Sequence, residues 1–269
     1  MKILQIISIF MMLFISISCE EVVEVDLEES QPRLVIEASL VWDINLQEET
    51  LFIKISKTAP FFEEEIPPVK EATVKVFSEK GEVYEFTQTE PGFYVHPGFP
   101  PQIGVDYTLE VVYNGEIYEA TEKFVPTVEL EDVTQDNEGG FSGNDIELKV
   151  FYTDPAGVQN NYLFRYFSNQ ISLQIYDDEL TDGNRNFAFF TDEDLKAGDR
   201  VIFEIQGISR PFYEYLFLLR SQAGGDNAGP FQTQPTTVKG NIVNTTDPEN
   251  FPFGFFRLSS SDFLEYVVQ

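Results

Sequence analysis

Cysteine and histidine, which most nucleophilic and metal sites use, are scarce in this 269-residue chain. The sequence contains one cysteine, Cys19, and one histidine, His96. A Ser-His-Asp triad would depend on His96, but this residue precedes Pro97 in an expected turn and has no Gly-x-Ser-x-Gly motif nearby. Zinc and iron sites need several imidazoles or thiolates in one place. The residue counts therefore exclude such metal sites, and we expect no catalytic role for His96.

Carboxylates are abundant, and they are densest in the segment YDDELTDGNRN. Its acidic side chains are Asp177, Asp178, Glu179 and Asp182. Calcium takes oxygen ligands of this kind, but the segment lacks the regular alternation of an EF-hand loop. We interpret it as a solvated turn, with calcium binding as the alternative. A glycosidase also needs only two acids beside a cleft, yet nothing in the sequence marks one pair.

Aromatic residues are frequent, with 26 phenylalanines and 12 tyrosines. Proteins that bind carbohydrate often present exposed aromatic side chains. Trp42, Tyr162, Tyr166, Tyr213 and Tyr215 could form such a platform. The same aromatic density is also what two β-sandwich cores require, so both interpretations stay open at this point.

The amino-terminal residues indicate export and lipid anchoring. Lys2 precedes an apolar run that is shorter than the roughly 20 residues of a membrane-spanning helix. Ser18 and Cys19 resemble the lipobox of bacterial lipoproteins, in which the cysteine is acylated after cleavage. We therefore predict a lipoprotein signal peptide over 1–18, lipidation of Cys19, and an acidic tether over 19–31. Two or three acyl chains would hold the protein on a membrane.

Charge excludes another class of function. The chain has 46 acidic and 17 basic side chains, which gives a formal net charge of −29. Such a surface repels phosphate backbones, so nucleic acid is excluded as a partner. The sequence also lacks a Walker loop and a Rossmann fingerprint, and we expect no cofactor.

Short alternating segments such as LFIKISK, ATVKVFS and YTLEVVY predict β-strands, and Asn114 with Gly115 predicts a tight hairpin turn. We expect an all-β fold of two antiparallel β-sandwich-like domains. The first is an Ig/fibronectin-like sandwich over 32–126, and the second is a β-rich domain over 127–269. The second contains one helix near 210–223, capped by Ser209. That helix is apolar nearly all round, so we expect it to be buried against a sheet, with a ligand groove lined by the helix as the alternative.

Several stretches together resemble one protein family. They are CEEVVEVDLEESQPRLVIEASL, KISKTAPFF, PGFYVHPGFPPQIGVDYTLEVVYNGEIYEA, YTDPAGVQNNY and GNIVNTTDPENFPFGFFRLSS. The family is the domain of unknown function 4249 family, outer-membrane lipoproteins of Bacteroidota-type bacteria. The resemblance implies a neighbouring TonB-dependent transporter, and it carries over no catalytic residue. The acids after Cys19 also resemble the signal that sends such lipoproteins to the cell surface.

The sequence thus leads to one main expectation. We expect a lipid-anchored outer-membrane protein, facing the cell exterior, that binds cargo as an accessory subunit of a TonB-dependent uptake system and is not an enzyme. The alternatives are a carboxylate-dependent hydrolase of polysaccharide or peptide, and a structural or adhesive surface lipoprotein.

Overall fold

The computed structural model describes residues 31–46, 49–60, 63, 65–140, 143, 145–169, 171–222 and 237–269. Residues Pro32–Gln269 form one compact unit. The predicted signal peptide, Cys19 and all but the last residue of the predicted tether lie outside the described residues, so these predictions stay predictions.

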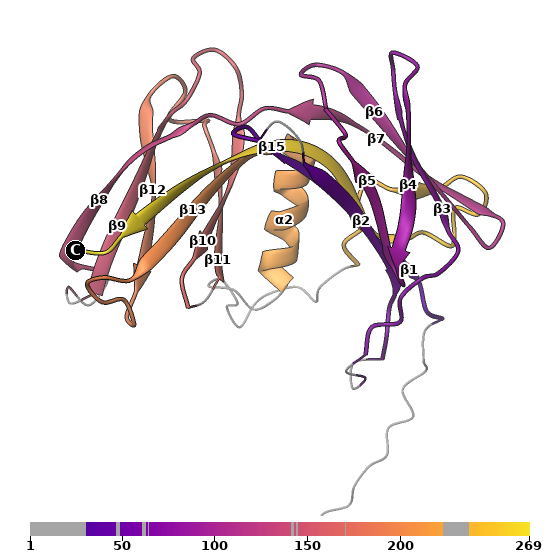
Figure 1. The fold of residues 1–269 in the computed structure, drawn as a ribbon, viewed down its shortest axis with the longest axis horizontal. Coiled ribbons are helices and arrows are strands. Elements are labelled where there is room, and N and C mark those ends of the chain that lie inside the picture. The colour runs from indigo at the N-terminus through magenta and orange to yellow at the C-terminus, as the bar shows by residue number, and fades with distance from the viewer. Residues whose placement is uncertain are drawn as a thin grey trace, which may run out of the picture. The chain divides into compact units, whose positions relative to one another are not determined.

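The described chain is built mainly of β-strands (Figure 1). The strands are β1 (Leu34–Asp43), β2 (Thr50–Lys57), β3 (Thr73–Ser78), β4 (Val83–Glu90), β5 (Phe93–Pro97), β6 (Asp106–Tyr113), β7 (Glu116–Val125), β8 (Leu130–Gly139), β9 (Asp145–Thr153), β10 (Asn161–Phe167), β11 (Ile171–Asp177), β12 (Arg185–Asp192), β13 (Arg200–Gly207), β14 (Val243–Asn244) and β15 (Phe253–Val267). Helix α2 spans Arg210–Gln222. The prediction of an all-β fold is confirmed, and the described residues contain one α-helix.

Eight strands around the first hydrophobic core close into a barrel. Twelve strands share one sheet in the order β11-β10-β13-β15-β1-β2-β5-β4-β3-β6-β7-β14, and β15 also pairs with β7. This second pairing places Leu258 opposite Phe124 and closes the ring from β15 through β1 to β7. Alternate residues of β1 point inward, and Ile36, Ala38 and Leu40 are fully buried.

The barrel differs from the antiparallel sandwich that the sequence predicts for the first part of the chain. Strand β1 pairs with β15 in parallel, from Val35 opposite Phe253 to Asp43 opposite Ser261. The period of two in a sequence determines which face of a strand is buried, but it does not determine which strand lies alongside. The same alternation therefore fits a sandwich and a closed barrel equally well.

The second hydrophobic core lies between two sheets, as in a sandwich. Strands β11, β10, β13 and β15 form one layer, and the three-stranded sheet β12-β9-β8 forms the other. Phe164 and Phe203 from the first layer pack in one cluster with Val150 and Phe190 from the second. These four side chains are almost completely buried.

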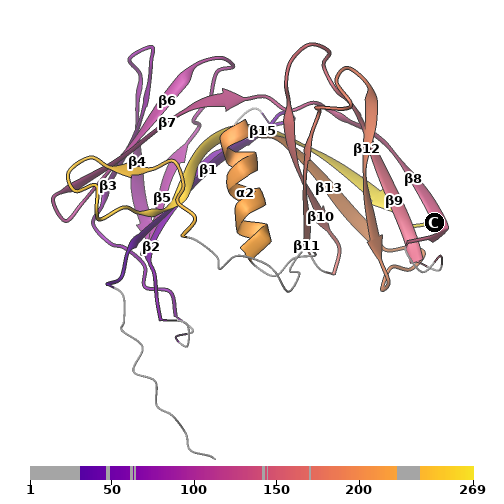
Figure 2. The same ribbon diagram turned by 180° about the vertical axis from the view of Figure 1, so that it is seen from behind.

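Strand β15 takes part in both cores, and Figures 1 and 2 show it running beside β1 and then beside β13. Its first half contributes Phe256 and Leu258 to the barrel core. Its second half pairs with β13, from Ser261 opposite Gln206 to Val267 opposite Arg200. A strand from the predicted second domain therefore completes the barrel, and the boundary at residue 126 stays a prediction.

Helix α2 is where the sequence predicts it, but only one side of it is buried. Ser209 caps it, since the Phe212 amide donates to Ser209 Oγ at 3.4 Å. Phe212 packs on Phe255 of β15, whereas Phe217, Leu218 and Leu219 are exposed. The helix packs on the sheet as expected, but the expectation that it is not exposed is wrong, because the sheet covers only one side of it. Within the described ranges, no helix is long and apolar enough to cross a membrane.

Candidate ligand-binding pocket beside helix α2

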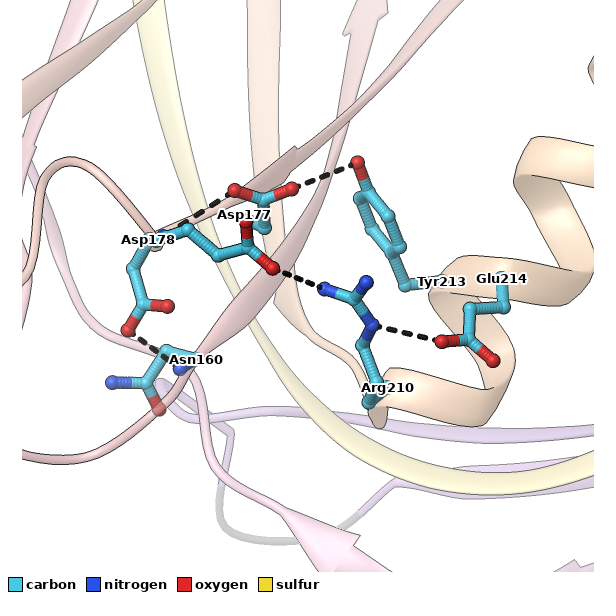
Figure 3. Close-up of polar contacts among 7 residues, drawn as sticks. Asn160, Asp177, Asp178, Arg210, Tyr213 and Glu214 are labelled. Atoms are coloured by element: carbon cyan, nitrogen blue, oxygen red, sulfur yellow. Dashed lines mark hydrogen bonds and ion pairs between the residues drawn. The ribbon is translucent and has the colours of Figure 1, made fainter.

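The four acids predicted as metal candidates separate onto two sides of a sheet. Asp177 is the last residue of β11, and Asp178 begins the loop 178–184 that leads to β12. Because successive residues of a strand point to opposite faces, the carboxylates of Asp177 and Asp178 turn away from each other (Figure 3). Asp178 and Asp182 lie on one side, whereas Asp177 and Glu179 contact helix α2 on the other.

On the first side, three carboxylates gather between two loops. Oxygens of Asp154, Asp178 and Asp182 lie within 4.8 Å of one another. Asp154 and Asp178 are buried, with 2% and 3% of their surface exposed, and Asp182 is exposed. Asp154 belongs to the loop 154–160 after β9, far from the acidic segment in the chain, and no sequence pattern indicates that it joins the group.

Hydrogen-bond donors surround these three carboxylates. Asp154 accepts from the Tyr162 hydroxyl at 2.6 Å and from the Gly183 amide at 3.0 Å. Asp178 accepts from the Asn160 amide at 2.7 Å, and Asp182 accepts from the Gly157 amide at 2.8 Å. Calcium takes six to eight oxygen ligands, and these donors occupy lone pairs that it would need. The group therefore ties the loops 154–160 and 178–184 together, and calcium binding there stays a hypothesis.

On the other side, Asp177 contacts the beginning of α2 (Figure 3). Glu179 contacts the same part of the helix through Arg210. Asp177 Oδ2 accepts from the Tyr213 hydroxyl at 3.1 Å. Arg210 lies between two carboxylates, at 3.4 Å from Glu179 and at 3.0 Å from Glu214. These contacts hold the end of β11 against the beginning of the helix.

A pocket of about 430 Å³ opens beside these residues, and Phe217 and Leu218 complete its lining. Its helical residues, Arg210, Tyr213, Glu214, Phe217 and Leu218, follow the spacing i, i+3, i+4, i+7 and i+8. Residues at this spacing share one face of a helix. One face of α2 therefore forms a wall that is charged near its amino-terminal end and apolar further along.

The charged end of the pocket is mostly acidic. Three carboxylates, those of Asp177, Glu179 and Glu214, meet one guanidinium, that of Arg210. Burial raises the pKa of the Tyr213 hydroxyl, and its hydrogen bond to Asp177 adds to the rise. The phenol therefore stays protonated at neutral pH and donates to Asp177. The hydrogen bond to Glu214 raises the pKa of Arg210, so this side chain stays cationic.

The aromatic residues considered as a platform have several different roles. Tyr162 and Tyr166 are buried in the second core, and Trp42 packs against the barrel core. Tyr215 lies on α2 and packs against Phe255 with a ring separation of 5.1 Å. Of the five, Tyr213 lines the pocket described above. The structure therefore assigns most of these residues to packing.

His96 is part of an aromatic group in the barrel. It belongs to β5, and its ring lies 5.5 Å from Tyr84, 5.6 Å from Phe86 and 6.3 Å from Phe99. Its Nδ1 atom is buried and has no hydrogen-bond partner among the described residues. The turn predicted for His96 is wrong, because this segment pairs with β2, with Leu51 opposite His96.

Acids with a raised pKa are relevant to the hydrolase alternative, which needs such a group in a cleft. Burial raises the pKa of Glu49 and that of Glu122. Glu49 precedes β2 and accepts from the Asp43 amide, and Glu122 lies on β7 and accepts from Asn241. Neither of these two carboxyl groups lines the pocket beside α2.

The sequence pointed to two of the seven pocket residues as acids of possible function, Asp177 and Glu179. The sequence favoured packing of α2 in the core and left a groove lined by the helix as the alternative, so Glu214, Phe217 and Leu218 were not singled out as pocket residues. One available signal was the pair Arg210 and Glu214, four residues apart, because a charged pair at this spacing marks an exposed helix face.

Comparisons with known proteins show a family and only distant structural likeness. No curated protein matches the sequence. A DUF4785 family protein from Legionella pneumophila is 13% identical with a TM-score of 0.26, and the match covers 67% of this chain and 54%, about half, of that one. A segment of two fibronectin type III domains from chicken tenascin is 13% identical with a TM-score of 0.22, covering 67% of this chain and 92% of the segment. The model of DUF4249, a domain of unknown function, matches residues 20–263, and the chain therefore belongs to this family.

Proposed function

We propose that this protein is a lipid-anchored outer-membrane protein, exposed to the cell exterior, that binds a ligand as an accessory subunit of a TonB-dependent uptake system. The anchor is supported by the sequence, in which Cys19 follows a short apolar run and precedes a string of acids. The link to a transporter is supported by analogy with the family that the motifs resemble. The binding role is supported by the pocket beside α2.

One observation carries the binding role, namely the exposure of Phe217 and Leu218 at the pocket. Their exposed fractions are 57% and 49%, and they lie beside charged side chains of the same helix face. A ligand that covers them gains about 25 cal/mol per Å² of apolar surface removed from water. Concave sites that combine apolar walls with a few polar groups are typical of ligand binding.

The anchor is tested by replacing the cysteine. In cells labelled with a fatty acid, we expect the parent protein to carry the label and to sediment with membranes. Cys19→Ser removes the thiol that would be acylated, so both properties should be lost. The control is Ser18→Ala, which keeps a small residue before the cysteine and should behave like the parent. A Cys19→Ser protein that still carries label and stays in the membrane pellet would contradict the anchor.

The partner is tested by crosslinking in intact cells. We expect the protein, purified from crosslinked membranes, to bring with it a large TonB-dependent transporter that mass spectrometry identifies. The control is the Cys19→Ser protein, which should not be enriched with any outer-membrane transporter. Protease added to intact cells should digest the folded part if it faces outward. Recovery of the parent protein without a transporter would end the uptake proposal.

A further inference from the structure

The wall that α2 forms beside the pocket has two chemically different ends. Arg210 and Glu214 lie toward its amino-terminal end, where Asp177 and Glu179 reach it from β11 and the following loop. Phe217 lies three residues beyond Glu214. Since a helix rises 1.5 Å per residue, the acidic end and the apolar end are separated by about 5 Å along the axis.

The acidic end has more negative than positive charge. Arg210 contacts Glu179 and Glu214, which leaves its guanidinium shared between two carboxylates. Asp177 is held by neutral donors, the Tyr213 hydroxyl at 3.1 Å and the Glu179 amide at 3.3 Å. With three carboxylates and one guanidinium, the pocket still offers an additional cation an excess of negative charge. The net charge of −29 of the whole chain attracts cations further.

Each single kind of ligand leaves part of this pocket unused. An anion would be repelled by the three carboxylates, and a wholly apolar ligand would desolvate them without compensation. A metal ion alone would leave Phe217 and Leu218 exposed to water. A ligand that carries a cationic group next to an apolar group satisfies both ends.

A short extended peptide has the matching geometry. Side chains two residues apart on an extended chain point to the same side and are separated by about 6.7 Å. This is close to the separation of the two ends of the wall. A volume of about 430 Å³ is at the small end of ligand pockets and suits two side chains.

We infer that the pocket beside α2 binds an extended peptide segment in which a lysine or arginine stands two residues from an aromatic or aliphatic side chain. The inference rests on the proposed function, because it names the ligand class of the same pocket. The cationic group contacts Asp177, and the apolar side chain covers Phe217 and Leu218.

The test uses the full-length protein in detergent and a fluorescent peptide, Gly-Lys-Ala-Phe-Gly, followed by fluorescence anisotropy. Two peptides serve as comparisons, one with Glu in place of Lys and one with Ser in place of Phe. We expect each to bind about tenfold or more weakly than the probe, since tenfold corresponds to the loss of one good contact. Equal binding of the three peptides would overturn the inference.

Matched variants assign the binding to this pocket. Asp177→Asn and Phe217→Ala should each weaken probe binding about tenfold. The controls are Glu79→Gln and Ile103→Ala, which change an exposed acid and an exposed aliphatic residue outside the pocket and should leave binding within about twofold of the parent. Urea unfolding checks that all four variants are folded. Equal losses of binding in pocket variants and controls would mean that the probe does not bind at this pocket, and this result would overturn the inference.

The two proposals can fail independently. A peptide that binds as expected, without any transporter in the crosslinked sample, would support the ligand class and contradict the uptake role. A transporter in the crosslinked sample, with no difference between the peptides, would contradict the ligand class only.

Discussion

Asp177 and Asp178 are adjacent in the chain, yet their carboxylates accept hydrogen bonds on opposite sides of the sheet. Asp177 accepts from the Tyr213 hydroxyl of α2, at the open pocket. Asp178 is buried and accepts from the Asn160 amide of the loop 154–160. Two neighbouring residues of the same type therefore have different roles, and substitutions of the two should differ in their effect on stability.

We predict that Asp178→Ala lowers the free energy of unfolding by about 1 to 3 kcal/mol, because it leaves the partly buried Asn160 amide without its acceptor. Asp177→Ala should lower it by less than about 1 kcal/mol, since water reaches the pocket and replaces the lost acceptor. Urea unfolding followed by tryptophan fluorescence measures both values. Equal losses in the two variants would contradict the division of the acidic segment into a buried and an open side.

A second prediction concerns the close contact between β1 and β15. Gly254 has φ of +99°, and a Cβ atom there would lie 2.0 Å from the carbonyl oxygen of Ile36. We predict that Gly254→Ala destabilises the protein by about 3 to 5 kcal/mol, from backbone strain and forced separation of the strands. The measurement is again the midpoint of urea unfolding.

Gly104→Ala is the control for this prediction. Gly104 also has a positive φ, +78°, but a Cβ atom there would meet nothing within 4 Å. Gly104→Ala should therefore lower the free energy of unfolding by about 1 to 2 kcal/mol, the cost of a positive φ in a residue with a Cβ atom. If the two variants lost equal stability, close strand packing at Gly254 would not contribute.

Local features of this fold could be predicted from the sequence. The hairpin turn at Asn114 and Gly115 joins β6 to β7, as the Asn-Gly sequence predicts. Both residues have the positive φ that such a turn requires. The helix at Arg210–Gln222 was predicted within one residue from its cap and its apolar spacing. These features depend on neighbouring residues, so a single sequence contains the information.

The closure of the barrel could not be predicted. It depends on β15 lying beside β1. In this pairing Arg257 donates a hydrogen bond to Ser39, although the two residues are 218 positions apart in the chain. No local pattern records such a contact. For the same reason Asp154 was not recognised as a partner of Asp178, although the density of acids after β11 was plain.

The side chain of Arg257 provides a third prediction. It is buried under α2, where its guanidinium donates to Ser39, Ser259 and Gln206 at 3.0, 2.8 and 2.7 Å and lies over the Phe212 ring. Burial lowers its pKa to about 9, and the nearby Arg165 adds to the decrease. Burial of the positive charge therefore costs free energy. The Arg257 side chain nevertheless supplies these hydrogen bonds and fills the space under the helix.

We predict that Arg257→Ala destabilises the protein by about 2 to 4 kcal/mol, because Gln206 loses a donor and a cavity opens beneath Phe212. The control is Arg200→Ala, which breaks an exposed ion pair with Glu265 and should cost less than about 1 kcal/mol. Urea unfolding of both variants gives the comparison. If Arg257→Ala lost no more stability than Arg200→Ala, the free-energy cost of burying the guanidinium would equal the stabilisation from its contacts.

The fourth prediction concerns pH, and it uses two glutamates whose pKa values shift in opposite directions. Burial raises the pKa of Glu122 above 4.5, whereas hydrogen bonds from Thr153 and Arg185 lower the pKa of Glu131 below 4.5. As pH falls from 7 toward 4.5, the folded protein binds a proton at Glu122 before the unfolded chain does, so folding becomes relatively more favourable. At Glu131 the unfolded chain binds the proton first, so the stabilisation by this residue is present above pH 4.5 and is lost as pH falls through its folded pKa.

Glu122→Gln and Glu131→Gln each remove one negative charge and one titration, so their comparison cancels the general effect of net charge. At pH 7, Glu122→Gln should be more stable than the parent, and this advantage should shrink as pH falls toward 4.5. Glu131→Gln should be less stable than the parent at pH 7, and its deficit should shrink below pH 4.5. Urea unfolding from pH 3.5 to 7 measures both differences. If Glu122→Gln were less stable than the parent at pH 7, desolvation could not be the dominant cause of the shifted pKa of Glu122; if Glu131→Gln were more stable, its hydrogen bonds would not stabilise the fold.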